Sequence, residues 1–162
     1  MALSGPVFFD TSVLLGGLVE LGPKSAAPMR LLDAVSEGRI PEPATAWHCC
    51  LELYAVATRL PEEFRLTSAA ARQLIEEEVL ARFELLDLPA RQRSGFLTSS
   101  AAEAILGGRI YDAHLAAIAL AGGARRLVTE NLRHFGSLHR HGVRVTTAAE
   151  TLAELTPPRQ RK

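Results

Sequence analysis

Several features are scarce or missing in this sequence of 162 residues, and each absence excludes a class of protein. The two cysteines, Cys49 and Cys50, are adjacent, and neighbours on a helix point about 100° apart, so they are not expected to bridge each other. No apolar run approaches the roughly 18 residues of a membrane-spanning helix, and no signal peptide is recognisable. We therefore expect a cytoplasmic protein with reduced, buried cysteines and no membrane segment.

Sites built from well-known short motifs are also missing. None of the three Gly-Gly pairs belongs to a dinucleotide-binding fingerprint or a P-loop. Among the five histidines only His139 and His141 are closely spaced, and suitably spaced thiolate or imidazole partners for zinc are lacking. Lys plus Arg equals Asp plus Glu at 18 each, which argues against a nucleic-acid binder held by bulk charge.

The composition that is present is that of a globular protein. Hydrophobic residues make up 48% of the chain and charged residues 22%, so the chain can bury a sizeable core. We expect a single domain over residues 1–155. The last seven residues, 156–162, hold two prolines and three basic residues and are expected to form a loose basic tail.

Strand and helix signals alternate along the chain. Short apolar or β-branched runs predict strands over 7–9, 83–88, 126–129 and 143–146, and a weak strand over 39–41. Helical periodicity, capping residues and terminal glycines predict helices over 26–37, 45–60, 67–81, 98–106, 109–121 and 148–155. This alternation predicts an α/β protein with a central parallel sheet and helices on both faces.

Polar residues at four places interrupt or follow these apolar segments. Asp10 directly follows the first strand, Thr129 and Asn131 follow the fourth, and Glu52 and Asp112 lie in apolar helices. Each has an ordinary explanation, such as a helix cap, a solvated helix face or the positive end of a helix dipole. The carboxyl ends of parallel strands meet at one edge of a sheet, however. If the first and fourth strands are neighbours, these side chains converge there.

The order and spacing of these positions resemble those of the PIN-domain nucleases, and most closely the VapC-type toxins of bacterial toxin–antitoxin pairs. The matching stretches are FFDTSVLL at 8–15, ELYAVATRL at 52–60, YDAHLAA at 111–117 and LVTENLRHF at 127–135. The resemblance covers the chain up to about residue 155. It implies a three-layer α/β/α fold and a divalent-metal-dependent endoribonuclease, which hydrolyses RNA phosphodiesters with metal-activated water.

The resemblance also implies which residues form the site. By position, Asp10, Glu52 and Asp112 match the acidic metal-site residues of the family, and Asn131 falls where a fourth carboxylate is common. Asparagine removes one negative charge, and Glu130 replaces it only if the turn rotates that side chain inward. The supporting polar positions correspond to Thr11, Ser12 and Thr129.

Elementary electrostatics is compatible with this assignment. Carboxylates that converge in a cleft repel one another and raise some of their pKa values, and a bound divalent ion relieves the repulsion. Ligands that are all oxygen favour Mg²⁺ or Mn²⁺ over zinc. Arg109, one turn before Asp112, is the strongest candidate for contacting an RNA phosphate, whereas most other arginines are expected to be solvated.

Two alternatives remain open at this point. Asp10 is also placed as the nucleophile of a haloacid-dehalogenase-like phosphatase, although position 12 is Ser, and Lys24 is the only lysine before the last residue. The other alternative is a non-catalytic PIN-like scaffold that binds RNA or a partner, which Asn131 alone favours.

The segment from Thr45 to Leu86 carries more apolar residues than one sheet face needs, which indicates a possible interaction surface. We expect Trp47 and Leu51 to complete the core, so the groove hypothesis depends on Phe64 and on the helix over 67–81. The resemblance implies that a small antitoxin binds such helices and that the chain forms a homodimer. The full set of candidate groove residues is Trp47, Leu51, Tyr54, Leu60, Phe64, Leu74 and Val79.

Overall fold

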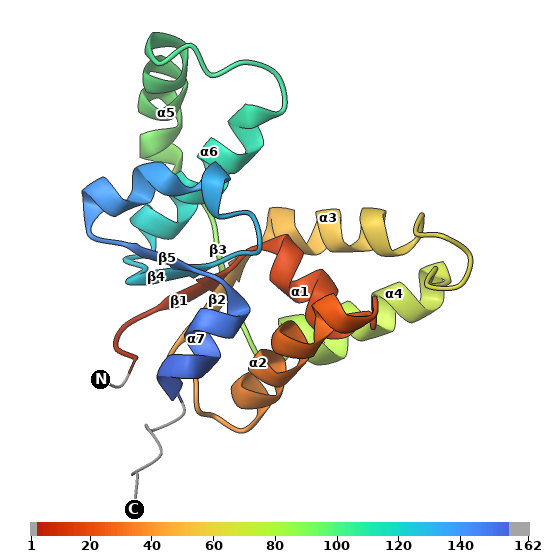
Figure 1. Ribbon diagram of the computed structural model, residues 1–162. Coiled ribbons are helices and arrows are strands. Elements are labelled where there is room, and N and C mark those ends of the chain that lie inside the picture. The colour runs from red at the N-terminus through yellow and green to blue at the C-terminus, as the bar shows by residue number, and fades with distance from the viewer. Residues whose placement is uncertain (1–2, 156–162) are drawn as a thin grey trace, which may run out of the picture.

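The predicted parallel sheet is confirmed by a computed structural model of the protein, which describes residues 3–155. All four strand pairings are parallel, and the strand order is β3-β2-β1-β4-β5 (Figure 1). The first and fourth strands are therefore neighbours, as the predicted convergence requires. The five strands are β1 (Val7–Phe9), β2 (Pro43–Ala46), β3 (Glu84–Leu86), β4 (Arg126–Val128) and β5 (Arg144–Thr146).

Helices cover both faces of this sheet, giving the expected three layers. On one face α1 (Thr11–Leu18) packs against α2 (Ala26–Ser36), which packs against α7 (Ala148–Leu155). On the other face lie α5 (Ala90–Ala102) and α6 (Arg109–Ala121), as Figure 1 shows. Three short 3₁₀ helices complete the turns: η1 (Pro23–Ser25), η3 (Leu132–His134) and η4 (Gly136–His141).

Two helical projections extend from the sheet (Figure 1). The first, which we call the α3–α4 arm, contains α3 (Trp47–Ala57), α4 (Ser68–Leu74) and the π-helical turn η2 (Ile75–Leu80). The second, which we call the α5–α6 arm, consists of α5 and α6 with the loop that joins them. Within residues 3–155, no helix combines the length and apolar character needed to cross a membrane.

The core is centred on β1, whose three residues are each at most 1% exposed. A central strand of a parallel sheet is covered on both faces, so its sequence is a continuous apolar run instead of an alternating one. Phe9 also packs edge-to-face on Phe83, with ring centroids 5.1 Å apart. This burial places the residue after β1, Asp10, at the edge of a rigid and closely packed element.

Two predicted elements lie elsewhere in the chain. The weak strand over 39–41 is wrong, because the second strand is β2 at Pro43–Ala46, and the predicted helix over 45–60 begins only at Trp47. Ala44 and Ala46 suit a helix, but pairing with β1 and β3 overrides that local preference. The helix predicted over 98–106 is α5, which begins at Ala90 and ends at Ala102. Its first turns are exposed and polar, so they carry no apolar periodicity.

Other helix boundaries agree with the sequence. The bounds of α6 and α7 are those predicted, and α2 ends one residue early. Thr67 caps α4 as expected, because its hydroxyl accepts a hydrogen bond from the Ala70 amide at 3.1 Å. The predicted helix over 67–81 changes at Ile75 from α to π geometry. The predicted basic tail, 156–162, lies outside the described residues.

An ion-pair network closes the sheet at the β4–β5 edge. Arg126 of β4 is 5% exposed, and its guanidinium pairs with the carboxylate of Glu154 on α7. Arg144 of β5 binds the same carboxylate from the solvent side at 2.8 Å. The hydrogen bond and charge of Arg126 lower the pKa of Glu154, with a smaller contribution from Arg144. The network joins α7 to the sheet far from both arms.

Candidate functional site

The candidate site lies where the topology of the sheet reverses. From β1 the chain continues to β2 on one side, whereas β4 lies on the other side of β1. In open α/β sheets such a reversal leaves a crevice beyond the carboxyl ends of the strands. Asp10 follows β1 and Thr129 follows β4, so both residues lie at this crevice.

Asp10 is buried and held in one orientation. It is 5% exposed, and its Oδ2 accepts hydrogen bonds from the hydroxyls of Thr129 at 2.8 Å and Ser12 at 2.9 Å. Burial raises the pKa of Asp10, and the Glu52 carboxylate adds to that rise, while the two hydroxyls oppose it. The side chain makes no capping hydrogen bond to α1, so the ordinary helix-cap explanation does not account for it.

The two hydroxyl residues connect β4 to α1 as well as orienting Asp10. The Ser12 hydroxyl oxygen accepts a hydrogen bond from the Glu130 amide at 3.0 Å, and that of Thr129 accepts one from the Asn131 amide at 3.0 Å. Thr129 is fully buried. Side chains supported in this way lose little freedom when a ligand binds, which is a requirement for an ordered site.

Glu52 enters the site from α3. The Thr11 hydroxyl donates a hydrogen bond to its Oε2 at 2.7 Å, and this contact joins α1 to α3 across the crevice. Glu52 is exposed, so it contributes a solvent-facing carboxylate beside the buried one of Asp10. Glu52 therefore lies on a solvated helix face, which is the ordinary explanation for a charge in this helix. That solvated face is turned toward the crevice.

Asp112 enters from the first turn of α6 and is paired with a histidine. Its Oδ2 lies 3.1 Å from Nδ1 of His134 on η3. Burial raises the pKa of Asp112, His134 lowers it, and the Glu52 carboxylate raises it. The Glu52 carboxylate therefore raises the pKa of both aspartates, Asp10 and Asp112.

The carboxylates are not assembled into a finished metal site. Within residues 3–155, no group of three or more His, Cys, Asp or Glu side chains has an arrangement that could hold a metal ion. Thr11 and His134 hold Glu52 and Asp112 instead. The donor set fits a hard divalent cation in its chemistry, since it consists of carboxylate oxygens.

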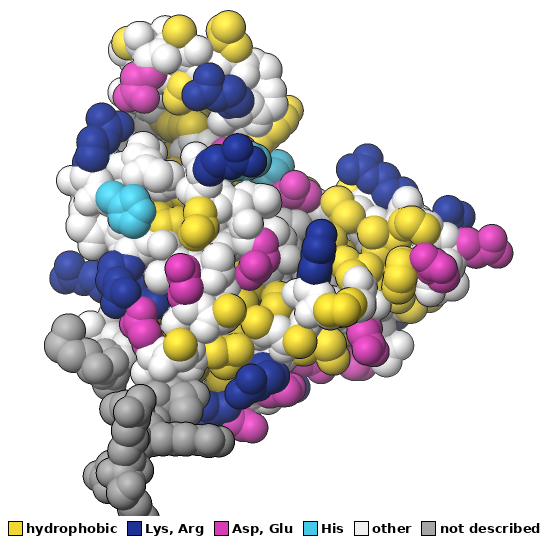
Figure 2. Space-filling model, viewed as in Figure 1, with side chains coloured by type: hydrophobic (Ala, Val, Ile, Leu, Met, Phe, Trp, Pro, Cys, Tyr) yellow, Lys and Arg dark blue, Asp and Glu magenta, His cyan; other side chains and the backbone are white. Residues whose placement is uncertain are grey.

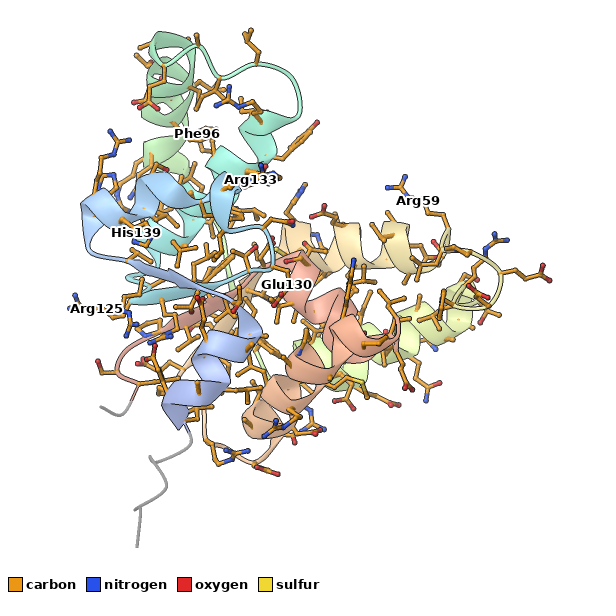
Figure 3. All side chains as sticks on the ribbon, in the orientation of Figure 1. Arg59, Phe96, Arg125, Glu130, Arg133 and His139 are labelled. Atoms are coloured by element: carbon orange, nitrogen blue, oxygen red, sulfur yellow. The ribbon has the colours of Figure 1, made fainter. Side chains whose placement is uncertain are left out.

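Three other residues considered from the sequence behave differently. The side chain of Asn131 is exposed and makes no capping hydrogen bond to η3, so it is not held in the site. Glu130 accepts a hydrogen bond from the Ala148 amide at the start of α7, at 3.0 Å, and so does not replace a fourth carboxylate (Figure 3). Arg109 is exposed, and among residues 3–155 it forms no ion pair with Asp112.

The cysteines behave as expected. Cys49 and Cys50 are free, and each is at most 1% exposed. Burial raises the pKa of the Cys49 thiol to about 11, so it stays protonated at neutral pH although it lies near Asp10 and Thr11. Neither thiol is a candidate nucleophile or ligand.

Comparison with known proteins identifies the fold family. A sequence profile described as the PIN domain matches residues 6–133, a range that includes all the candidate residues from Asp10 to Asn131. The chain belongs to the PIN domain family. Ribonuclease VapC27 of Mycobacterium tuberculosis is 33% identical over 144 residues, which cover 89% of this chain and 98% of that protein.

Solved structures of PIN-like proteins share the fold at low sequence identity. VapBC-1 of nontypeable Haemophilus influenzae matches with a TM-score of 0.60 and 14% identity, over 90% of this chain and 99% of that one. VapBC2 of Rickettsia felis, bound to a DNA fragment from its promoter, matches with a TM-score of 0.59 and 15% identity, over 88% and 98%. FitAB bound to a DNA fragment matches with a TM-score of 0.59 and 13% identity, over 96% of this chain and 99% of that one. These likenesses confirm the predicted PIN-like fold.

A groove on the α3–α4 arm corrects one expectation for this PIN domain. Trp47 and Leu51, expected in the core, are 51% and 52% exposed and line a groove of about 420 Å³ together with Tyr54 of the same helix. Figure 2 shows hydrophobic side chains gathered along this arm. Phe64, on which the hypothesis had depended, does not line the groove, and Val79 is fully buried.

Sequence reasoning missed two features beside the site. The first is His134, the partner of Asp112. Its sequence position was a usable signal, because it lies three residues after Asn131 in the segment that follows β4. The second feature, a cluster of rings around Tyr111, had a weaker signal in the sequence. Tyr111 precedes the candidate carboxylate Asp112, and its stacking partner His48 lies one helical turn before Glu52. Only the tertiary fold brings those two rings, one on α3 and one on α6, together.

Proposed function

We propose that this PIN domain is a divalent-metal-dependent endoribonuclease, and that it acts as the toxin of a toxin–antitoxin pair in the cytoplasm. The observation that carries the proposal is the buried Asp10 carboxylate at the carboxyl end of β1, which the hydroxyls of Ser12 and Thr129 hold in place beside the Thr11–Glu52 hydrogen bond. Membership of the family and the similarity to a protein named as a ribonuclease support the same chemistry.

Mg²⁺ or Mn²⁺ would be held by Asp10, Glu52 and Asp112, with Asn131 as a further oxygen donor. When bound, such an ion lowers the pKa of a water molecule and stabilises negative charge on a phosphate during in-line displacement. The chain itself orients the ligands, since Thr129 and Ser12 fix Asp10 and Thr11 fixes Glu52. No side chain is required as a nucleophile.

The phosphatase alternative loses support from the contacts of Ser12. Such a phosphatase needs a second acidic group two residues after Asp10 as its general acid or base, and that position is Ser12. The Ser12 hydroxyl donates a hydrogen bond to Asp10 and accepts one from the Glu130 amide. Ser12 is thereby committed to orienting Asp10. The scaffold alternative depends on Asn131 alone, and the three carboxylates argue against it.

Cleavage of a single-stranded RNA in the presence of Mn²⁺ tests the nuclease. We expect Asp10→Asn to lower the rate by roughly 10³-fold, because the metal supplies several kcal/mol of transition-state stabilisation. Asp33→Asn, at an exposed position of α2, is the matched control and should cleave at the wild-type rate. Full activity of Asp10→Asn, or activity of the wild-type protein that survives EDTA, would contradict the assignment.

The α3–α4 arm supports the antitoxin part of the proposal. A helix with apolar anchors at i, i+3 and i+4 fits a groove lined by Trp47, Leu51 and Tyr54, and exposed apolar patches of this kind commonly mark interaction sites. Two of the solved structures that share this fold, VapBC2 and VapBC-1, are toxin–antitoxin complexes. Expression of the chain alone should arrest growth, and co-expression of the small protein encoded just upstream should restore it.

A homodimer is the last part of the proposal, and it is supported by the resemblance to VapC-type toxins. Sedimentation equilibrium of the purified chain tests it directly. A monomer at micromolar concentration would remove the dimer from the proposal while leaving the nuclease chemistry in place.

A further inference from the structure

Four aromatic rings form a continuous cluster at the base of the two arms. His48 of α3 stacks on Tyr111 of α6, with ring centroids 5.6 Å apart and an interplanar angle of 15°. His114 lies edge-on to His48 at 6.5 Å, and Phe96 of α5 is tilted against His114 at 5.6 Å (Figure 3). The cluster therefore runs from the root of α3, across α6, to α5.

Tyr111 stays largely exposed although its ring is stacked on that of His48. His48 covers one side of the ring, yet Tyr111 is still 58% exposed. An aromatic ring of this size ordinarily buries most of its area in a protein. This exposure leaves room for a further planar group to extend the stack on the side of the ring away from His48, which we call the platform.

A pocket of about 410 Å³ opens beside this platform between α5 and α6. Its lining is largely apolar and aromatic, with Phe96, Leu97, Tyr111 and His114 as the main contributors. Arg93 also lines it and pairs with Asp87 at 3.5 Å, so hydrogen-bond donors and acceptors are present at its rim. The volume is sufficient for one nucleoside, and the polar rim suits the edge of a base.

The platform is directly connected to the candidate catalytic residues. Tyr111 precedes Asp112 in the sequence, and His48 lies one helical turn before Glu52. Each ring of the stacked pair is thus close in sequence to one of the three candidate carboxylates. Two exposed arginines flank the same region: Arg109 begins α6, and Arg133, labelled in Figure 3, adjoins His134, the partner of Asp112. Among residues 3–155, neither arginine forms an ion pair.

We propose that the side of the Tyr111 ring away from His48 stacks on one unpaired base of the RNA next to the scissile phosphate, and that the pocket between α5 and α6 receives this base. The inference rests on the proposed nuclease function and names the part of the substrate that a subsite recognises. Single-stranded nucleic acids are commonly held by a positive groove with aromatic platforms on which successive bases stack.

The chemistry of the lining favours a base over a peptide side chain as the occupant. A helix that binds a protein groove needs a long aliphatic surface, and the α3–α4 arm provides one. The α5–α6 pocket instead presents ring faces, a polar rim and neighbouring cations beside a site that acts on phosphate. An apolar ligand would gain nothing from Arg109 and Arg133, whereas a nucleotide brings a phosphate to them.

A double-mutant cycle between protein and strand tests the subsite without depending on cleavage. The protein carries Asp10→Asn so that the strand stays intact in Mn²⁺, and the ligand is a fluorescent single-stranded oligonucleotide with one abasic nucleotide moved along it. In the otherwise unchanged protein, we expect the abasic nucleotide at one position to weaken binding about tenfold. Tyr111→Ala should weaken binding of the intact strand about tenfold, and the abasic nucleotide should then cost nothing further.

Matched variants separate stacking from other roles of the side chain. Tyr111→Phe and Tyr111→Trp keep a ring and should keep both affinity and coupling, whereas loss of either in Tyr111→Phe assigns the effect to the hydroxyl and overturns stacking. Tyr54→Ala, the other tyrosine of the chain, lies in the α3–α4 groove and should leave oligonucleotide binding unchanged. Tyr111 is exposed, so its replacement should not alter the melting temperature.

Several outcomes would overturn the inference. Independent losses from Tyr111→Ala and the abasic nucleotide, or no loss from either, would mean that no base stacks there. Weaker antitoxin binding by Tyr111→Ala with unchanged oligonucleotide binding would assign the platform to a protein partner. If the wild-type protein cleaves RNA but the effects of Tyr111→Ala and the abasic nucleotide are not coupled, the subsite alone is rejected. If the two effects are coupled but the wild-type protein does not cleave RNA, the nuclease is rejected and the subsite is kept. Failure of the Asp10→Asn protein to bind any strand would reject the subsite as well.

Discussion

The α3–α4 arm and the α5–α6 arm carry pockets of similar volume and different lining. Each contributes one carboxylate to the crevice, Glu52 from α3 and Asp112 from α6, and each carries a pocket of about 420 or 410 Å³. The first pocket combines aliphatic side chains with Trp47 and Tyr54, and it also touches Arg72 and Glu76. The second combines aliphatic side chains with three rings, and it also touches Asp87 and Arg93; the rings are those of Phe96, Tyr111 and His114. Pocket size is therefore uninformative here, and the lining determines the class of ligand.

Helix α3 illustrates how one element serves both purposes. Trp47, Leu51 and Tyr54 recur at helical spacing and line the groove, while His48 and Glu52 lie one position further round and face the crevice. Adjacent residues in the sequence thus belong to different surfaces. Under the proposed function, an antitoxin helix in the groove would lie one helix width from the carboxylates, which gives it a short route to inhibit them.

In the comparison of the two arms, the largest expected effect comes from placing the same charge in each arm. Leu51→Glu should weaken antitoxin binding by about 100-fold, because it buries an unpaired carboxylate at the centre of an apolar interface, and should change RNA cleavage by less than about twofold. Leu97→Glu, at a comparably exposed leucine of the α5–α6 pocket, should weaken oligonucleotide binding and spare the antitoxin. Affinity titrations of both variants against both ligands check this. Equal effects on both ligands would dissolve the distinction between the arms.

A smaller effect is expected from a site that belongs to neither arm. Glu154→Gln removes the countercharge of the buried Arg126 and should lower the free energy of unfolding by about 2 kcal/mol at pH 7. Because Arg126 lowers the pKa of Glu154, this stabilisation is present above the ordinary Glu range and is lost as the pH falls through the lowered pKa. Urea denaturation at pH 7 and in acid should therefore show the two proteins converging at low pH.

The solvent-exposed partner in that network provides the control. Arg144→Gln should cost less than about 1 kcal/mol, because its side chain is mostly solvated. Neither variant should alter antitoxin or oligonucleotide affinity once the unfolded fraction is taken into account. A selective change in one affinity would mean that the β4–β5 edge is coupled to one of the arms.

The smallest effect concerns Asn131, which lies between the arms after β4. If its side chain is a weak further ligand, Asn131→Asp should tighten Mn²⁺ binding by about threefold through added negative charge on a hard oxygen donor. Calorimetric titration measures it, with Asn131→Ala as the variant that removes the donor. Identical affinities in all three proteins would leave Asn131 without a role at the metal.

The candidate site residues follow partly from local patterns and partly from the resemblance to PIN-domain nucleases. A continuous apolar run predicted β1, and the residue after a buried parallel strand lies at the ligand-binding edge. The roles of Asp10, Glu52, Asp112 and Asn131 stay predictions, but the structure brings the first three into electrostatic contact and leaves the Asn131 side chain exposed. Sequence patterns identify the residues of a site more readily than the orientation of each side chain.

The sequence by itself determined the alternation of strands and helices, the buried first strand and the bounds of α6 and α7, because apolar periodicity and capping act within a few residues. Tertiary structure alone decided that Ala44–Ala46 pair in a sheet, since neighbouring strands supply the hydrogen bonds. It also decided that Trp47 and Leu51 are exposed and that His48 stacks on Tyr111. A helix with apolar residues on more than one side does not specify which side meets the core, and contacts between residues far apart in sequence settle that choice.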